Sequence, residues 1–332
     1  MAIEKRYTDR MIAVNQFPSP GESSIRGVIH QWNEAIDQTT ELLGYGLACG
    51  QLDAAWVANL QATARRLSEL AAGHADAALY ILIQMAASEV VHYSARHAVL
   101  CAVVSELCAQ QLGWSRADIE SLNCAALTMN VGMTELQDVL AQQLSPLTPE
   151  QRRAVSEHAG KSAALLQAGG VQDPLWLDIV RRHHEADAQR DELPPSGPRM
   201  ARLLRRVDIY TAKLSRRAGR DPRSPAIAAR DACLNSVGLP DAVGATLMSV
   251  LGLYPPGCFV ALANGDIGVV IERGSQAHNP QVVSLRRADG SEYEQPLRRD
   301  TQLQAFEVLR SLPVMRGKLQ HDLAAILGAA PD

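Results

Sequence analysis

Histidines, together with one aspartate, are the residues of this sequence whose types and spacing could do chemistry. The chain of 332 residues has nine histidines, and His183 and His184 stand in tandem before Glu185. Adjacent helical residues point about 100° apart, so such a pair suits a helix end where the rings reach inward toward a metal. Taken singly, each candidate is more often a hydrogen-bonded structural residue. Further candidates lie in other stretches of helical pattern: His97, His158 and Asp208.

The composition indicates that helices position these residues. Hydrophobic residues make up 47% of the chain and aromatic residues only 4%, so the core must consist of Leu, Val, Ile and Ala, which favours helices over sheets. Several histidines and an aspartate, each on a different helix, are how a helical bundle builds a metal site in its core. After Gly252 the pattern changes. Short apolar runs around the turns Asn264-Gly265 and Asp289-Gly290 predict a small β module of four or five strands.

These patterns divide the chain into four parts. Residues 1–85 are predicted to form an N-terminal helical region without chemistry, and residues 86–250 a helical domain that holds the candidate histidines. The β module spans 251–316, and 317–332 has the pattern of a C-terminal amphipathic helix. A polar, proline-rich stretch, 187–198, predicts a surface loop.

Charge, cysteines and hydropathy restrict the compartment and the partners. A net charge of −4 gives no argument for binding to nucleic acid or to a membrane surface. The charged first ten residues lead into no apolar segment, so we expect no signal peptide, and no apolar run approaches the roughly 20 residues of a membrane span. The six cysteines form no CxxC pair, which is typical of buried thiols in a reducing cytoplasm. We therefore expect a cytoplasmic protein.

Read in order, several segments resemble the HD-GYP family, the helical metal-dependent phosphodiesterases that hydrolyse cyclic di-GMP. The resemblance covers roughly residues 88–275. It implies a mainly α fold: an HD-type helical bundle with an N-terminal helical region and a small C-terminal β module. The segments that carry it are Tyr93–Ala98, Cys124–Met133, Ser145–His158, His183–Glu185, Ala201–Tyr210 and the C-terminal module Tyr254–Val270.

The resemblance implies metal ligands and phosphate-binding residues. One divalent ion (Fe, Mn or Zn), or none, is expected on the five remaining ligand positions: His97, His158, His183, His184 and Asp208. Arg217 and Arg220 follow Asp208 at the spacing at which the family places the residues that hold the phosphates of cyclic di-GMP. Arg202 belongs to the same basic stretch, for which a solvated helix face is the alternative. Guanidinium groups bind phosphate through paired hydrogen bonds.

The departures from the family lie at the reaction centre. Met129 and Asn130 replace the signature His-Asp pair, and Met133 stands where the family has a Lys. The family's Asp bridges two metal ions, but Asn is neutral, and the Met thioether is a poor ligand for hard or borderline ions. The family's Gly-Tyr-Pro loop is also replaced, by residues 187–198. Two-metal hydrolysis needs ions held about 3.5–4 Å apart, so these changes predict weak or absent hydrolysis.

Two functions from different classes therefore stay open. The first is a catalytically impaired protein of cyclic di-GMP signalling that acts as a regulator, nucleotide-binding protein or adaptor, with cyclic di-GMP or a signalling protein as its partner. The alternative is an active metal-dependent cyclic di-GMP phosphodiesterase that uses the remaining ligands. Nucleic-acid binding by the β module has little support, because residues 252–290 lack a basic face with aromatic residues.

Overall fold

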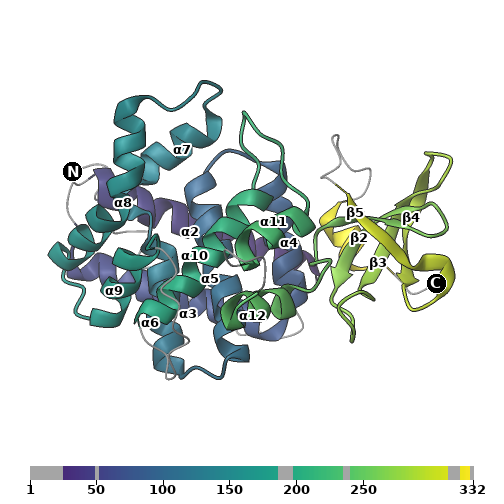
Figure 1. Cartoon of the computed structure of the whole chain (residues 1–332), viewed down its shortest axis with the longest axis horizontal. Coiled ribbons are helices and arrows are strands. Elements are labelled where there is room, and N and C mark those ends of the chain that lie inside the picture. The colour runs from purple at the N-terminus through teal and green to yellow at the C-terminus, as the bar shows by residue number, and fades with distance from the viewer. Residues whose placement is uncertain (1–24, 49–51, 186–196, 235–239, 313–321, 330–332) are drawn as a thin grey trace.

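The computed structural model has a large helical part and a small sheet at one end of the molecule (Figure 1). It describes residues 25–48, 52–185, 197–234, 240–312 and 322–329. The predicted mainly α fold with a small C-terminal β module is confirmed.

The helices begin where the sequence supplies capping residues. Thr148 and Gln151 form a capping box around Pro149, and the side chain of Ser115 caps the helix that follows it. The longer helices are α2 (Ile25–Ala48), α3 (Ala54–Gly73), α4 (Ala75–Ser88), α5 (Tyr93–Gln111), α6 (Arg116–Thr128), α8 (Pro149–Ala168) and α10 (Gly197–Leu214). The shorter ones are α7 (Thr134–Gln142), α9 (Pro174–Arg182), α11 (Pro225–Cys233), α12 (Ala242–Leu251), α13 (Leu323–Leu327) and the 3-10 turns η2 (Val131–Met133) and η3 (Gln304–Phe306).

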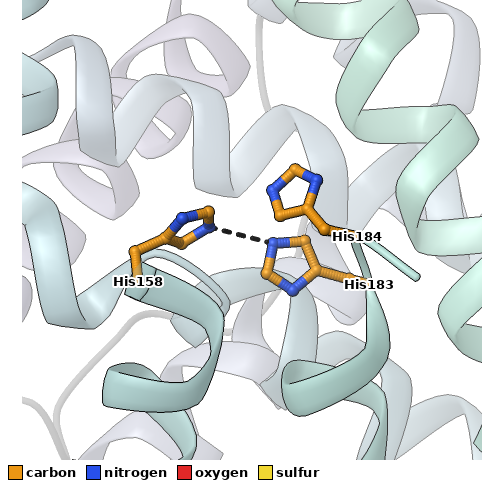
Figure 2. Close-up of side chains that lie close together, drawn as sticks. All are labelled: His158, His183 and His184. Atoms are coloured by element: carbon orange, nitrogen blue, oxygen red, sulfur yellow. Dashed lines mark hydrogen bonds between the residues drawn. The ribbon is translucent and has the colours of Figure 1, made fainter. Parts of the chain in front are cut away.

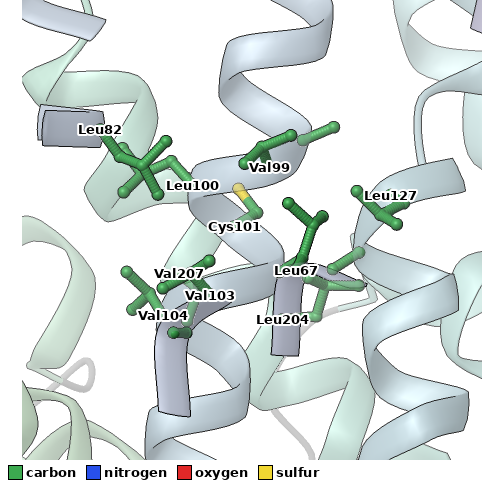
Figure 3. Close-up of a cluster of buried hydrophobic side chains, with 14 of the residues drawn as sticks. Leu67, Leu82, Val99, Leu100, Cys101, Val103, Val104, Leu127, Leu204 and Val207 are labelled. Carbon is green, nitrogen blue, oxygen red and sulfur yellow. The ribbon is translucent and has the colours of Figure 1, made fainter. Parts of the chain in front are cut away.

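Helix α5 lies at the centre of the helical part. Nearly all of its residues are buried, as expected for a helix that is surrounded by other helices rather than exposed on one side. It packs against α4, α6 and α10, and apolar side chains, mainly leucine and valine, fill the space between them (Figure 3). His97 lies in the first turns of this helix, so its ring is placed inside the bundle and not on its surface.

The N-terminal helices α2, α3 and α4 share this core. Trp32 and Trp56 are buried in it, and the indole nitrogen of Trp56 donates to the carbonyl oxygen of Leu42 at 2.8 Å. Helix α13 returns to α2, where Arg26 and Asp322 form an exposed ion pair at 3.1 Å. The first and last described helices are therefore neighbours.

The sheet is antiparallel, with the strand order β4-β3-β2-β1-β5. Its strands are β1 (Phe259–Leu262), β2 (Ile267–Glu272), β3 (Gln281–Arg286), β4 (Glu292–Asp300) and β5 (Val308–Leu312). Successive strand residues point to opposite faces, so Val269 joins the main core while Val270 belongs to a second apolar cluster. Strand β2 packs against α4. The predicted turn at Asn264-Gly265 joins β1 to β2, and Gly265 there has a φ of 86°.

The loop predicted over 187–198 ends earlier than expected, because Gly197 and Pro198 begin α10. Proline is well tolerated in the first turn of a helix, so the prediction is wrong for these two residues. Residues 187–196 lie outside the described residues. Within the predicted C-terminal helix, 317–332, the structure describes residues 322–329, and α13 is the helical part of these. Residues 317–321 and 330–332 lie outside the described residues, as do residues 1–24. No single described helix is long and apolar enough to cross a membrane. Helices α3 and α4 meet the requirements of length and hydropathy only together, and this pair is bent by 117°.

Candidate functional site

Three of the predicted ligands meet between α8 and the end of α9 (Figure 2). His158 lies on α8, and His183 and His184 directly follow α9. Asp173 caps the start of α9 by accepting from the backbone of Leu175 and Trp176, which fixes the helix that delivers the tandem pair. His158 and His183 are buried, whereas His184 is exposed. We call these residues the histidine trio.

The hydrogen bonds of the trio fix where the protons sit on two of its rings. Nδ1 of His158 lies 2.6 Å from the carbonyl oxygen of Val155, and Nδ1 of His183 lies 2.7 Å from that of Val180. A carbonyl oxygen only accepts, so each Nδ1 carries a hydrogen and each neutral ring keeps a lone pair on Nε2.

The two Nε2 atoms face each other at 3.2 Å (Figure 2). Two lone pairs at this distance repel each other unless a cation lies between them. Zinc–nitrogen bonds of about 2.0–2.1 Å in tetrahedral geometry place two nitrogens about 3.3–3.4 Å apart. The spacing of His158 and His183 therefore fits two ligands of one ion, and imidazole suits Zn, Fe and related divalent ions.

Burial keeps both of these rings neutral. Desolvation, helped by the neighbouring His184, lowers the pKa of His183 to about 3, although the charge of Asp208 acts in the opposite direction. Desolvation is also the main cause that lowers the pKa of His158. Metal ligation requires the neutral ring, so the environment of the trio favours the form that binds a metal.

The other two predicted ligands form a separate group on α5 and α10. Nε2 of His97 lies 2.8 Å from Oδ1 of Asp208. The sulfur of Cys101 is 3.6 Å from the same Nε2 and 3.1 Å from Oγ1 of Thr211. His97 and Cys101 are buried, and the Asp208 side chain is 17% exposed. We call His97, Cys101 and Asp208 the ion-pair group; its ligand atoms also lie within 4.8 Å of one another, close enough for a metal.

Charge is already balanced in the ion-pair group. Burial alone would lower the pKa of His97, but Cys101, Tyr93 and the bond to Asp208 outweigh it and raise that pKa well above 6.5. Burial would likewise raise the pKa of Asp208, but the hydrogen bond and charge of His97 lower it to about 2. The two residues are therefore a protonated imidazole and a carboxylate near neutral pH, which need no further ion.

The segment with the altered signature packs beside the trio. The Met129 side chain is 1% exposed and lies in the hydrophobic core. The backbone N–H of Gly132 donates to Oγ of Ser162 at 2.9 Å, and Ser162 lies one turn after His158 on α8. A Cβ on Gly132 would come within 2.9 Å of the Ser162 backbone nitrogen, so this close approach requires glycine. Asn130, which directly precedes η2, and Met133, the last residue of η2, are partly buried.

The three arginines have different surroundings. Arg217 donates to the Tyr93 hydroxyl at 3.0 Å and lies over the Tyr93 ring, whose face stacks on His97. Arg220 donates to the carbonyl oxygen of Ala212 at 2.6 Å. Arg202 is partly buried on α10, but it lies six residues before Asp208 and so about 120° around the helix from it. Arg217 is therefore connected to the ion-pair group through Tyr93.

Sequence reasoning missed two members of the ion-pair environment. Cys101 follows His97 by four residues on α5, and Thr211 follows Asp208 by three on α10. Helical residues three or four apart are neighbours on one face. That spacing was the signal that could have found both.

Comparisons with known proteins agree with this fold. Residues 80–233 match the HD domain family. A cyclic di-GMP phosphodiesterase of Pseudomonas aeruginosa is 26% identical over 211 residues, which are 62% of this chain and 50% of that protein. The chain thus spans about half the length of this curated relative.

A solved structure has the same fold. It is an HDG"Y"P protein from Bdellovibrio bacteriovorus, with a TM-score of 0.52 and 16% sequence identity over 75% of this chain and 79% of that one. At this identity the likeness concerns the fold alone. Residues 80–233 are thus similar in sequence to the HD domain family, and the chain resembles that HDG"Y"P protein in fold.

Proposed function

We propose that this protein is a catalytically impaired HD-GYP-type protein of cyclic di-GMP signalling, which binds one divalent ion and the cyclic dinucleotide without hydrolysing it rapidly. The observation that carries the metal part is the 3.2 Å approach of the two Nε2 atoms of His158 and His183, each with its Nδ1 hydrogen used by a carbonyl oxygen. A bound ion would supply Lewis acidity and charge for a phosphate group.

The loss of a bridging carboxylate supports the impaired function. In a two-metal site a shared group holds the ions about 3.5–4 Å apart and generates the attacking hydroxide. Here the position of that group is Asn130, and its neighbour Met129 is packed into the core. Asp208, the remaining acid of the predicted set, is already paired with His97. No predicted ligand of the described residues is therefore left to bridge two ions.

Arg217 is the best-placed candidate for the nucleotide phosphates. It is only partly buried, and its side chain is held by Tyr93 next to His97. A guanidinium group so oriented binds phosphate at low entropic cost. Arg220 and Arg202 stay as additional candidates on the same part of the chain.

Calorimetry with cyclic di-GMP tests the nucleotide part. Wild type should bind, and Arg217→Ala should bind about 10- to 100-fold more weakly, because a hydrogen bond to a charged group contributes about 1.5–3 kcal/mol. Arg310→Ala, an exposed arginine on β5, is the matched control and should bind like wild type. If the wild type does not bind the nucleotide, the protein is an adaptor that acts through a protein partner.

Turnover assays with manganese or iron separate this proposal from an active phosphodiesterase. The relative from Pseudomonas aeruginosa bears that activity in its name, which favours it as the second candidate. Hydrolysis by wild type that disappears in His183→Ala would establish the enzyme and overturn the impaired function. Conversely, Met129→His combined with Asn130→Asp should raise metal uptake above one ion per chain, because it restores the missing ligands.

A further inference from the structure

Helix α7 packs against the rest of the protein through polar and small residues. The residues that it buries are Thr134, Gln137 and Ala141. On the same helix the carboxylate of Asp138 accepts from Ser94 at the start of α5, from the backbone N–H at 2.7 Å and from the hydroxyl at 3.0 Å. A surface helix normally buries an apolar stripe and exposes its polar side. In α7 this order is reversed.

The apolar residues of α7 and of the segment after it stay at the surface. Leu136, Val139 and Leu140 lie three and four positions apart, so they share one side of the helix. None of the three belongs to either apolar cluster of the described residues, and Val139 is 54% exposed. Leu144 and Leu147, between α7 and α8, are 79% and 37% exposed. We call these five residues the α7 face. Helix α7 lies at the outer edge of the helical part (Figure 1), and exposed apolar groups of this kind mark interaction sites.

The C-terminal end of α7 lies beside cations at the start of α8. Nε2 of Gln151 donates to Oε1 of Gln143 at 2.8 Å, which holds the first turn of α8 against the end of α7. Arg152 and Arg153 follow Gln151, and both are exposed. Neither pairs with a carboxylate in the part of the chain that the structure describes. The exposed Glu150 offsets only part of their charge.

The turn between α10 and α11 adds positive charge to the same end. The backbone N–H of Ala218 donates to the carbonyl oxygen of Ala141 at 2.7 Å, so this turn touches the last turn of α7. Residues 216–223 contain four arginines and one acid, Asp221. Arg216 and Arg223 are exposed, and within the described residues neither pairs with a carboxylate.

The N-terminal end of α7 carries the opposite charge. Glu135 lies in the first turn of the helix, is exposed, and forms no ion pair among the described residues. A helix of nine residues is about 13 Å long, so this acid and the cations at the other end are clearly separated. The α7 face therefore has an apolar middle, an acidic end and a basic end.

We propose that the α7 face binds the α7 face of a second copy of this chain, with the two helices antiparallel across a two-fold axis. Symmetric dimers use the same patch of both protomers. The antiparallel arrangement brings Glu135 of one protomer to the partner's Arg152, and the reverse, so unlike charges meet at both ends. A parallel arrangement would bring like charges together. The dimer uses neither the metal ion nor the nucleotide, so it stands apart from the proposed function.

Sedimentation equilibrium of the full chain over about a 100-fold range of protein concentration tests the proposal. Wild type should pass from monomer to dimer as the concentration rises. Val139→Glu and Leu144→Glu change exposed side chains, so the fold is kept, and each should weaken the dimer about tenfold or more. Leu309→Glu, at a 61% exposed position on β5, is the matched control and should associate like wild type.

A charge exchange tests the antiparallel arrangement. Glu135→Arg and Arg152→Glu, each alone, place like charges at both ends and should weaken the dimer about fivefold or more at low salt. An equal mixture of the two variants should associate like wild type, because unlike charges meet again at both ends. A wild type that stays monomeric over the whole range overturns the dimer and assigns the α7 face to a different protein. Unchanged association of both glutamate variants overturns its location, and a mixture that associates no better than the single variants overturns the antiparallel arrangement.

Discussion

The histidine trio and the ion-pair group contain the same kinds of ligand but are opposite in charge balance. In the trio, His158 and His183 are neutral and aim their free lone pairs at each other across 3.2 Å. In the ion-pair group, His97 is protonated and Asp208 is its counterion at 2.8 Å. The first arrangement offers two lone pairs to a cation, whereas in the second the protonated ring of His97 already carries the positive charge.

Residues that a sequence resemblance groups together as ligands therefore need not form one metal site. The hydrogen on each Nδ1 decides which ring has a lone pair to offer, and a carboxylate next to a buried histidine can take the place of a metal as its partner. The resemblance grouped five ligands, and their contacts divide them into two sets with different expected behaviour.

The largest expected effect concerns the ion-pair group. In metal-free protein, Asp208→Ala should lower the free energy of unfolding by about 3 kcal/mol near pH 6, because it leaves His97 buried without its counterion. Chemical denaturation measures this loss. Asp37→Ala, at an exposed position on α2, is the control and should lower stability by less than about 0.5 kcal/mol. A loss as small as that for Asp208→Ala would contradict a buried ion pair.

Metal binding should depend mainly on the trio. His183→Ala removes one of the two facing lone pairs and should weaken the binding of a divalent ion by about 100-fold or more, since even changes behind the ligands cost 10- to 100-fold. His278→Ala, an exposed histidine between β2 and β3, should bind like wild type. If Asp208→Ala weakens metal binding as strongly as His183→Ala, the two groups share the ion and the division between them is wrong.

The two groups should respond to pH in opposite directions. The pKa of His97 is raised above 6.5. The stabilisation that its ion pair adds to the free energy of unfolding is therefore complete below pH 6.5, and it is lost as the pH rises through the raised pKa. The pKa of His183 is lowered to about 3. Above pH 6.5 its ring is neutral in both the folded and the unfolded protein, so the free energy of unfolding is not reduced there. As the pH falls from 6.5 toward 3, the unfolded protein takes up a proton that the folded protein does not, and the free energy of unfolding decreases by up to about 1.4 kcal/mol per pH unit.

Chemical denaturation of metal-free protein across this pH range measures the two changes in the free energy of unfolding separately. His97→Gln should abolish the alkaline loss and keep the acid one. His183→Gln should reduce only the acid loss. A flat profile above pH 6.5 in wild type would show that His97 does not titrate as part of an ion pair.

The smallest effect is expected for Cys101. Cys101→Ser keeps a hydrogen-bonding group against Thr211, so it should cost about 1 kcal/mol of stability. Metal stoichiometry should stay the same, because the ion is expected on the trio. A drop in bound metal in this variant would make the thiol a ligand and turn the ion-pair group into a second metal site.

How much the sequence predicted depended on the range of the contacts. Helices such as α8 were predictable because Thr148 and Pro149 act locally, and the strands after Gly252 because the turn residues do. His158 and His183 are both buried, but their role as metal ligands stays a prediction. The pairing of His97 with Asp208, in contrast, joins residues 111 positions apart. Such contacts depend on how helices pack, which no local pattern encodes.

Metal content and nucleotide turnover, measured together on one purified sample after loading with manganese, test the central claim most directly. The account predicts one bound ion per chain, lost in His183→Ala, and cyclic di-GMP that is bound yet recovered intact after long incubation. Conversion of the nucleotide to its linear form by wild type, but not by His183→Ala, would contradict it.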